Sequence, residues 1–115
     1  MLVAIAAAKT GGLQAPMDKR FGRAPLFVVC HSETGEVRAE VLNGAVEAQH
    51  GAGPRAANLI KEHGAEAVIA RSFGPKAAGA LDGLGIRMLT VAEGLTVGEA
   101  LDRLRDGGTT AFGSR

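Results

Sequence analysis

The sequence predicts a single α/β domain in which helices cover both faces of a mixed β-sheet. Residues 2–8 form a continuous apolar run, which is typical of a central strand buried on both faces. Residues 25–42 contain two strand-like runs around a short turn with a glycine, which indicates an antiparallel hairpin. Beyond residue 53, helical and strand-like segments alternate, which is typical of β–α units.

The length of 115 residues suits one domain with a buried core, and 46% of the residues are hydrophobic. Only 3% are aromatic, and Trp and Tyr are absent. We therefore expect a core of small side chains in which Phe21 and Phe27 are largely buried. The domain is expected to span residues 1–107, and residues 108–115 are expected to form a flexible tail.

The formal net charge is only +1, so no overall positive field favours a nucleic-acid partner. The single cysteine excludes an internal disulfide and favours a reducing compartment. The apolar run at 2–8 is too short for a membrane span or a signal peptide. The sequence therefore predicts a soluble cytoplasmic protein with no membrane partner, in which any anion site depends on local clusters of basic residues.

Five strands are expected. The strand at 25–31 is apolar, whereas residues 37–42 alternate apolar and polar side chains and are expected to lie half-exposed at the sheet edge. Two further apolar segments, 66–71 and 86–91, each follow a predicted helix. Right-handed crossovers favour placing the 66–71 strand beside the first strand, at 2–8.

Three helices are expected. Pro54 opens the first, in which apolar residues recur at helical spacing as far as the stop signal at Gly64. Pro75 opens the second. Thr96 and Glu99 have the spacing of a capping box and predict the start of the third.

Five motifs then follow one another along the chain: RFGRA at 20–24, ETGEV at 33–37, HGAGPRAA at 50–57, FGPKAAGAL at 73–81 and TVGEAL at 96–101. In this order and spacing the chain resembles the nitrogenase iron–molybdenum cofactor accessory proteins, which include NifX, NafY and the C-terminal part of NifB. The resemblance implies a three-layer α/β/α, ribonuclease-H-like fold. Its five-stranded mixed sheet would have the order 3-2-1-4-5, with strand 2 antiparallel to the rest.

In this topology the loop 9–24 and the glycine-rich starts of the first two helices meet at one edge of the sheet. Ligands of open α/β sheets bind at such an edge, and helix starts with free N–H groups favour anions. The charged residues expected there are the basic Lys9, Lys19, Arg20, Arg23, Arg55, Arg71 and Lys76 and the acidic Asp18, Glu47 and Glu93.

The basic residues either form an anion site, or they pair with the neighbouring acids or point to solvent. His50 is the predicted metal ligand, because imidazole suits iron and molybdenum. The alternative interpretation is that His50 is an ordinary loop histidine that makes one backbone hydrogen bond. The predicted cofactor-binding residues are Lys9, Arg20, Phe21, Gly22, Arg23, His50, Gly51, Gly53, Gly74 and Lys76.

Cys30 and His31 are expected at the opposite edge, because a strand of six or seven residues separates them from its start by roughly 20 Å. Adjacent strand residues point to opposite faces, so these two side chains are not expected to share one ion. His63, at the end of the first helix, is expected at the same far edge. Cys30 is interpreted as a small core residue.

The resemblance implies a non-enzymatic binding or carrier protein for an iron–sulfur or iron–molybdenum cofactor or its precursor, in the metal-cluster assembly that serves nitrogen fixation. The partner would be a protein that donates or accepts the cluster. The absence of any acid in residues 2–8 argues against the two-metal chemistry of ribonuclease-H-like nucleases. The alternative is a regulatory or scaffold domain that binds a protein partner without metal, through residues 37–42 or the tail.

Overall fold

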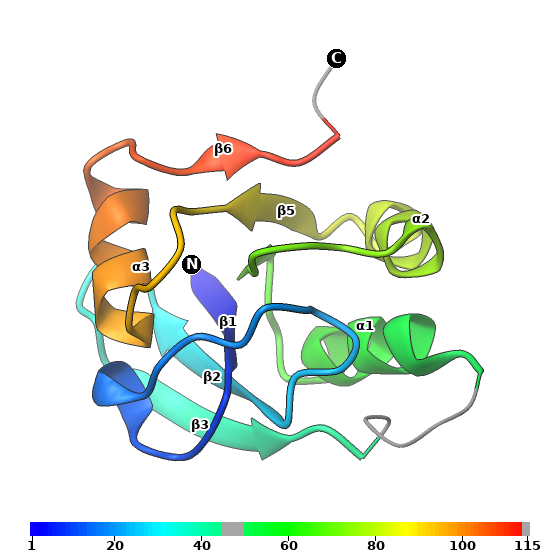
Figure 1. Ribbon diagram of the computed structural model, residues 1–115, viewed down its shortest axis with the longest axis horizontal. Helices are drawn as coiled ribbons and strands as arrows, with labels where there is room; N and C mark the ends of the chain where they lie inside the picture. The colour runs from blue at the N-terminus through cyan, green and yellow to red at the C-terminus, as the bar shows by residue number, and fades with distance from the viewer. Residues whose placement is uncertain (45–49, 114–115) are drawn as a thin grey trace.

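The structure is a computed structural model that describes residues 1–44 and 50–113. Its described part contains one mixed sheet with the strand order β3-β2-β1-β4-β5-β6 (Figure 1). The strands are β1 (Leu2–Ala7), β2 (Leu26–His31), β3 (Val37–Leu42), β4 (Ala67–Ile69), β5 (Arg87–Thr90) and β6 (Thr110–Ala111).

The strand directions confirm the predicted mixed sheet. Strands β1, β4 and β5 are parallel, and β2 runs antiparallel to β1 with Leu26 opposite Ala7. The β3 strand pairs antiparallel to β2 and lies at the sheet edge, where Leu42 is 74% exposed. The predicted order of the first five strands is therefore confirmed, including the central place of β1.

The sheet has one strand more than the five expected. Thr110 and Ala111 pair antiparallel to β5, at Thr90 and Leu89. The sequence offered no partner for this segment, because a strand of two exposed residues carries no pattern of buried side chains. The strand β6 therefore extends the edge of the sheet beyond β5 (Figure 1).

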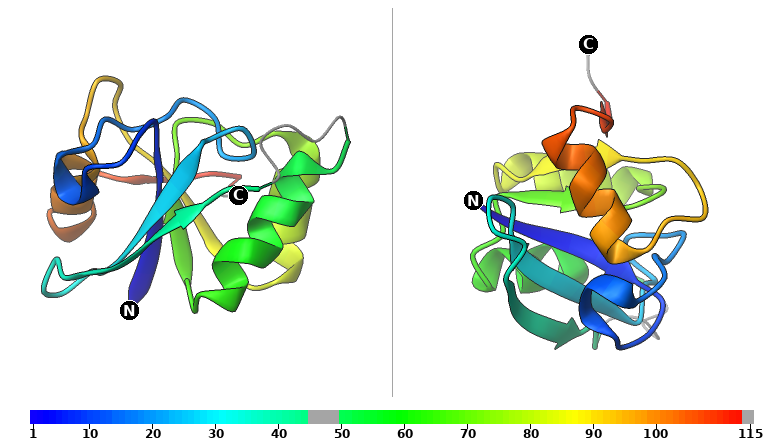
Figure 2. Two further views of the ribbon diagram at one scale, coloured as in Figure 1. Left: turned by 90° about the horizontal axis from the view of Figure 1, so that it is seen from below. Right: turned by 90° about the vertical axis from the view of Figure 1, so that its left-hand side faces the viewer.

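Helices cover both faces of the sheet, as predicted (Figure 2). One face carries α1 (Ala52–Glu62) and α2 (Pro75–Gly83), and the other carries α3 (Val97–Arg105) and a short 3₁₀ helix, η1 (Gly12–Gln14). No helix in the described part of the chain is long and apolar enough to cross a membrane.

Side chains of β1 alternate between the two layers, which explains its continuous apolar sequence. Val3 and Ile5 pack towards α3, whereas Ala4 and Ala6 pack towards α1 and α2, and all four are fully buried. Because the alanines leave space on the α1/α2 side, larger side chains from elsewhere in the chain fill that layer.

The helix starts agree with the sequence signals, with one difference. Thr96 and Glu99 form the predicted capping box of α3, and Pro75 is the first residue of α2. Helix α1 begins at Ala52, two residues before the predicted start at Pro54. Gly51 precedes it with φ 75°, a left-handed conformation that glycine adopts without strain. Proline is tolerated in this first turn because its missing N–H has no helical partner there.

Candidate functional site

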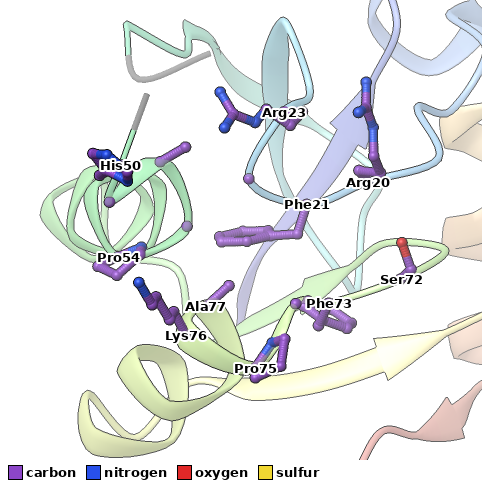
Figure 3. Close-up of a pocket in the computed structure, with 15 residues that line it drawn as sticks. Arg20, Phe21, Arg23, His50, Pro54, Ser72, Phe73, Pro75, Lys76 and Ala77 are labelled. Carbon is purple, nitrogen blue, oxygen red and sulfur yellow. The ribbon is translucent and has the colours of Figure 1, made fainter. Parts of the chain in front are cut away.

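A pocket of about 620 Å³ lies between the loop 20–23, the start of α1 and the start of α2 (Figure 3). It opens at the sheet edge where β1 and β4 end, which is the edge predicted from the sequence. The residues that line it are Arg20, Phe21, Gly22, Arg23, His50, Gly51, Ala52, Gly53, Pro54, Ser72, Phe73, Gly74, Pro75, Lys76 and Ala77.

The floor of the pocket is apolar. Phe21 is 1% exposed, and its ring lies 5.2 Å from that of Phe27 and 5.6 Å from that of Phe73. Figure 3 shows the Phe21 side chain between the two helix starts, and Ala77 lies beside it. The expected burial of Phe21 and Phe27 is confirmed. The loop 20–24 is thus anchored by the buried aromatic side chain of Phe21.

Basic side chains surround this floor. Arg20 and Lys76 are exposed, Arg23 is half-buried, and the exposed imidazole of His50 stands at the start of α1 (Figure 3). No aspartate or glutamate belongs to the described residues that line the pocket. Three basic side chains and an imidazole therefore belong to a lining whose described residues include no carboxylate, which favours an anionic ligand.

Two helix starts add to this electrostatic character. Gly51 precedes α1 and Gly74 precedes α2, and neither start has a side-chain cap. The first N–H groups of a helix lack backbone partners within the helix and carry a partial positive charge. Both helix starts line the same pocket, so their peptide dipoles reinforce the charge of the basic side chains.

The structure brings most of the predicted site residues together. Lys9 is the exception: it is exposed on the segment between β1 and η1 and does not line the pocket. Arg71 instead donates to the carbonyl of Val91 and pairs with Glu93 at 3.5 Å. Glu47 lies outside the described residues. The predicted residues that line the pocket are Arg20, Phe21, Gly22, Arg23, His50, Gly51, Gly53, Gly74 and Lys76.

Two of the predicted glycines also serve close backbone packing. A Cβ atom on Gly22 would lie 3.0 Å from the Cα of Gly53, and a Cβ on Gly53 would lie 2.6 Å from the Cβ of Ala77. Because these positions lack side chains, the loop 20–24 can approach α1 this closely, and α1 can approach α2. Gly74 differs, because a Cβ there would meet nothing within 4 Å.

Several lining residues had not been predicted as site residues. Phe73, Pro75 and Ala77 belong to the FGPKAAGAL motif, so a signal for them existed in the sequence. Ser72 precedes this motif, and its hydroxyl donates to the carbonyl of Lys19 at 2.9 Å. The backbone N–H of Phe21 in turn donates to the carbonyl of Ser72 at 3.1 Å. This second loop therefore holds one end of the RFGRA loop.

The pocket contains one side chain that suits a transition metal, His50. Among the described residues, no group of three His, Cys, Asp or Glu side chains could hold a metal ion. Cys30 lies on the α3 side of the sheet and pairs with Val3, at the opposite end of β1 from the pocket. His31 contacts the guanidinium of Arg38 at 3.2 Å. The predicted far-edge position of Cys30 and His31 is confirmed.

Cys30 should resist alkylation in the folded protein. Burial raises the pKa of its thiol from 9.0 to about 11, so at about pH 8 the reactive thiolate is scarce and also shielded. Iodoacetamide followed by mass spectrometry should leave Cys30 unmodified in native buffer and modify it in guanidinium chloride. Rapid labelling of the native protein would contradict the buried position.

Comparisons with known proteins agree with this fold. Residues 1–107 match the family described as dinitrogenase iron-molybdenum cofactor. The apo form of the orange protein (ORP) from Desulfovibrio gigas has 37% sequence identity and a TM-score of 0.91, over 98% of this chain and 93% of that chain. A NifB-like protein from Thermotoga has 30% identity and a TM-score of 0.83, over 99% of this chain and 95% of that chain.

A protein of Methanocaldococcus jannaschii described as uncharacterised is 35% identical over 72 residues. This match covers 61% of each chain, so it spans about three fifths of the length of that curated relative. The family match, by contrast, extends over most of the present chain and includes every element from β1 to α3. The chain therefore belongs to the dinitrogenase iron-molybdenum cofactor family.

Proposed function

We propose that this protein is a non-enzymatic, cytoplasmic carrier that binds an anionic iron–sulfur or iron–molybdenum cofactor, or a precursor of it, as cargo in the pocket. The observation that carries this proposal is the composition of the pocket. Arg20, Arg23 and Lys76 surround an apolar floor, and the described residues that line the pocket include no carboxylate. A volume of about 620 Å³ is in the range of small-molecule sites and exceeds what a single ion needs.

The available donor atoms favour a preassembled cluster over bare metal ions. Protein-bound iron–sulfur clusters are normally held by several cysteine thiolates, whereas Cys30 lies in the other layer of this protein. The pocket offers cations, helix-start N–H groups and one imidazole. These groups suit a cluster that arrives with its inorganic ligands attached and that is bound mainly through its negative charge.

His50 is proposed as the direct metal contact. Its imidazole is exposed next to Gly51, at the start of α1, and belongs to the pocket lining. A ring nitrogen can occupy one free coordination position of iron or molybdenum. A single protein ligand of this kind, together with charge, allows a carrier to release its cargo more readily than a full set of thiolates would.

The family and its members support this proposal. The family description names the dinitrogenase iron-molybdenum cofactor, and the orange protein is similar over nearly the whole chain. That structure is described as an apo form, which implies that the orange protein also has a ligand-bound form. We propose that the partner of the present protein is another protein that donates or accepts the cluster, and that it approaches the open side of the pocket.

The test is an anaerobic titration with iron–molybdenum cofactor extracted from nitrogenase, followed by electron paramagnetic resonance. Arg20→Ala, Arg23→Ala and Lys76→Ala should each weaken binding about tenfold, because each removes one of several charge-assisted contacts. The loss should shrink at high salt, where such contacts are screened. Lys9→Ala is the matched control, because this cation lies outside the pocket, and it should bind like the wild type.

His50→Ala should behave differently from the charge variants. It should change the spectroscopic signature of the bound metal, because a coordination position changes its ligand, while the melting temperature stays nearly unchanged at this exposed position. A wild-type protein that binds no cofactor would overturn the carrier proposal. The scaffold alternative would then be preferred, because β3 leaves Val37 and Leu42 exposed at the sheet edge.

A further inference from the structure

Asn43 stands out as a buried polar residue close to the pocket. It is 3% exposed and is the only buried polar residue in the described part of the chain. It follows the end of β3 and does not itself line the pocket. A buried side-chain amide is costly unless its hydrogen-bonding groups have partners, so the partners of Asn43 indicate what it does.

Three hydrogen bonds from Asn43 reach the RFGRA loop and the residue that follows it, Pro25. The side-chain nitrogen Nδ2 of Asn43 donates to the carbonyl oxygens of Gly22 at 3.1 Å and Ala24 at 2.8 Å. The backbone N–H of Asn43 donates to the carbonyl of Pro25 at 2.9 Å. A side-chain amide nitrogen has two N–H groups, so both are directed at this one loop.

Arg23 lies between the two carbonyl groups that Asn43 holds. The peptide unit before Arg23, Gly22–Arg23, and the peptide unit after its neighbour, Ala24–Pro25, are therefore both fixed, and the side chain of Arg23 lines the pocket (Figure 3). The same hydrogen bonds direct the negative ends of two carbonyl dipoles towards the Asn43 amide. We propose that Asn43 is a positioning residue that holds Arg23 at the pocket. What Arg23 binds there rests on the proposed function, whereas the fixing of the loop does not.

Ser72 holds the other end of the same loop and supplies a matched comparison. Its hydroxyl donates to the carbonyl of Lys19, and its own carbonyl accepts from the N–H of Phe21. Loss of the Ser72 hydroxyl should therefore loosen the loop before Phe21. Loss of the Asn43 amide should loosen the loop after Phe21, around Arg23.

The first measurement needs no ligand. Amide hydrogen exchange, followed residue by residue by NMR, should become about tenfold faster at residues 22–24 in Asn43→Ala than in the wild type, after correction for global stability. In Ser72→Ala the increase should be confined to residues 19–21. Unchanged exchange at residues 22–24 in a folded Asn43 variant would overturn the positioning role.

The second measurement is a double-mutant cycle with the extracted iron–molybdenum cofactor as the probe. If Asn43 acts through Arg23, Asn43→Ala should weaken binding about tenfold, and the double variant with Arg23→Ala should bind no more weakly than either single variant. The effects of Asn43→Ala and Lys76→Ala should instead multiply. Multiplication of the Asn43→Ala and Arg23→Ala effects would show that Asn43 does not act through Arg23.

A second variant covers the case in which Asn43→Ala fails to fold. Asn43→Ser retains one donor on a smaller side chain and should show the same changes in exchange and binding at a smaller amplitude. A wild-type protein that binds no cofactor, but whose exchange at residues 22–24 depends on Asn43, would reject the carrier function and keep the positioning role. Normal binding with exchange independent of Asn43 would reject the positioning role alone.

Discussion

Replacing Phe21 with alanine should lower the free energy of unfolding by about 3–5 kcal/mol, as for other fully buried phenylalanines. The side chain is 1% exposed and packs against the rings of Phe27 and Phe73. The fully buried side chains of β1 on the α1/α2 side are those of Ala4 and Ala6, which are too short to fill the space that the ring leaves. Urea denaturation of the two proteins measures the difference.

Phe112→Ala is the matched control for this prediction. The ring of Phe112 packs against that of Phe73 in a tilted arrangement with ring centres 5.1 Å apart, but Phe112 is 38% exposed and lies beyond β6. Its removal should cost about 1 kcal/mol, which is close to the value of an aromatic pair without a buried cavity. A loss below about 1 kcal/mol for Phe21→Ala would contradict the close packing of the pocket floor.

Gly53→Ala should also destabilise the protein, although alanine is normally preferred to glycine in a helix. The added Cβ would lie 2.6 Å from the Cβ and 3.0 Å from the Cα of Ala77, so α1 and α2 would have to move apart. Overpacking of this kind costs about 1–3 kcal/mol or more, which exceeds the helix-propensity gain of at most about 1 kcal/mol. Thermal and urea denaturation would measure the net loss.

Gly79→Ala provides the control for Gly53→Ala. Both glycines lie in helices, but a Cβ on Gly79 would meet nothing within 4 Å. This substitution should therefore raise stability by about 0.5–1 kcal/mol. If Gly53→Ala were stabilising to the same degree, the close contact between α1 and α2 would be wrong. Ala77→Gly should partly rescue Gly53→Ala, because it removes one of the contacting atoms.

The general position of the site could be predicted because it depends on topology. Once the strand order is known, one edge of the sheet must contain the end of a buried parallel strand, a loop rich in arginine and two glycine-rich helix starts. This reasoning placed Arg20, Arg23, His50 and Lys76 at one edge of the sheet, and in the structure they line a single pocket there. The same reasoning predicted Lys9 at the site, but Lys9 does not line the pocket, because it lies on the segment that leads from β1 to η1, on the α3 side of the sheet.

Other parts of the site could not be predicted, because they depend on contacts between residues distant in sequence. The sequence suggested an anion-binding role for Gly22 and Gly53, whereas their distances to neighbouring backbone reveal a packing requirement as well. Asn43 gave no signal, because one asparagine after a strand is an ordinary loop residue until the loop 22–24 folds against it. The pairing of β6 with β5 likewise depends on contacts between segments that are distant in the sequence.

The layered arrangement of this protein follows from local patterns in its sequence. The apolar run at 2–8, the alternation at 37–42 and the Thr96–Glu99 capping box each act within a few residues, through burial or through local hydrogen bonds. The pocket, by contrast, depends on tertiary contacts. Its segments lie far apart in the chain and meet in the apolar floor, in the glycine contacts and in the hydrogen bonds of Asn43. They come within contact distance only because α1 and α2 pack against the sheet.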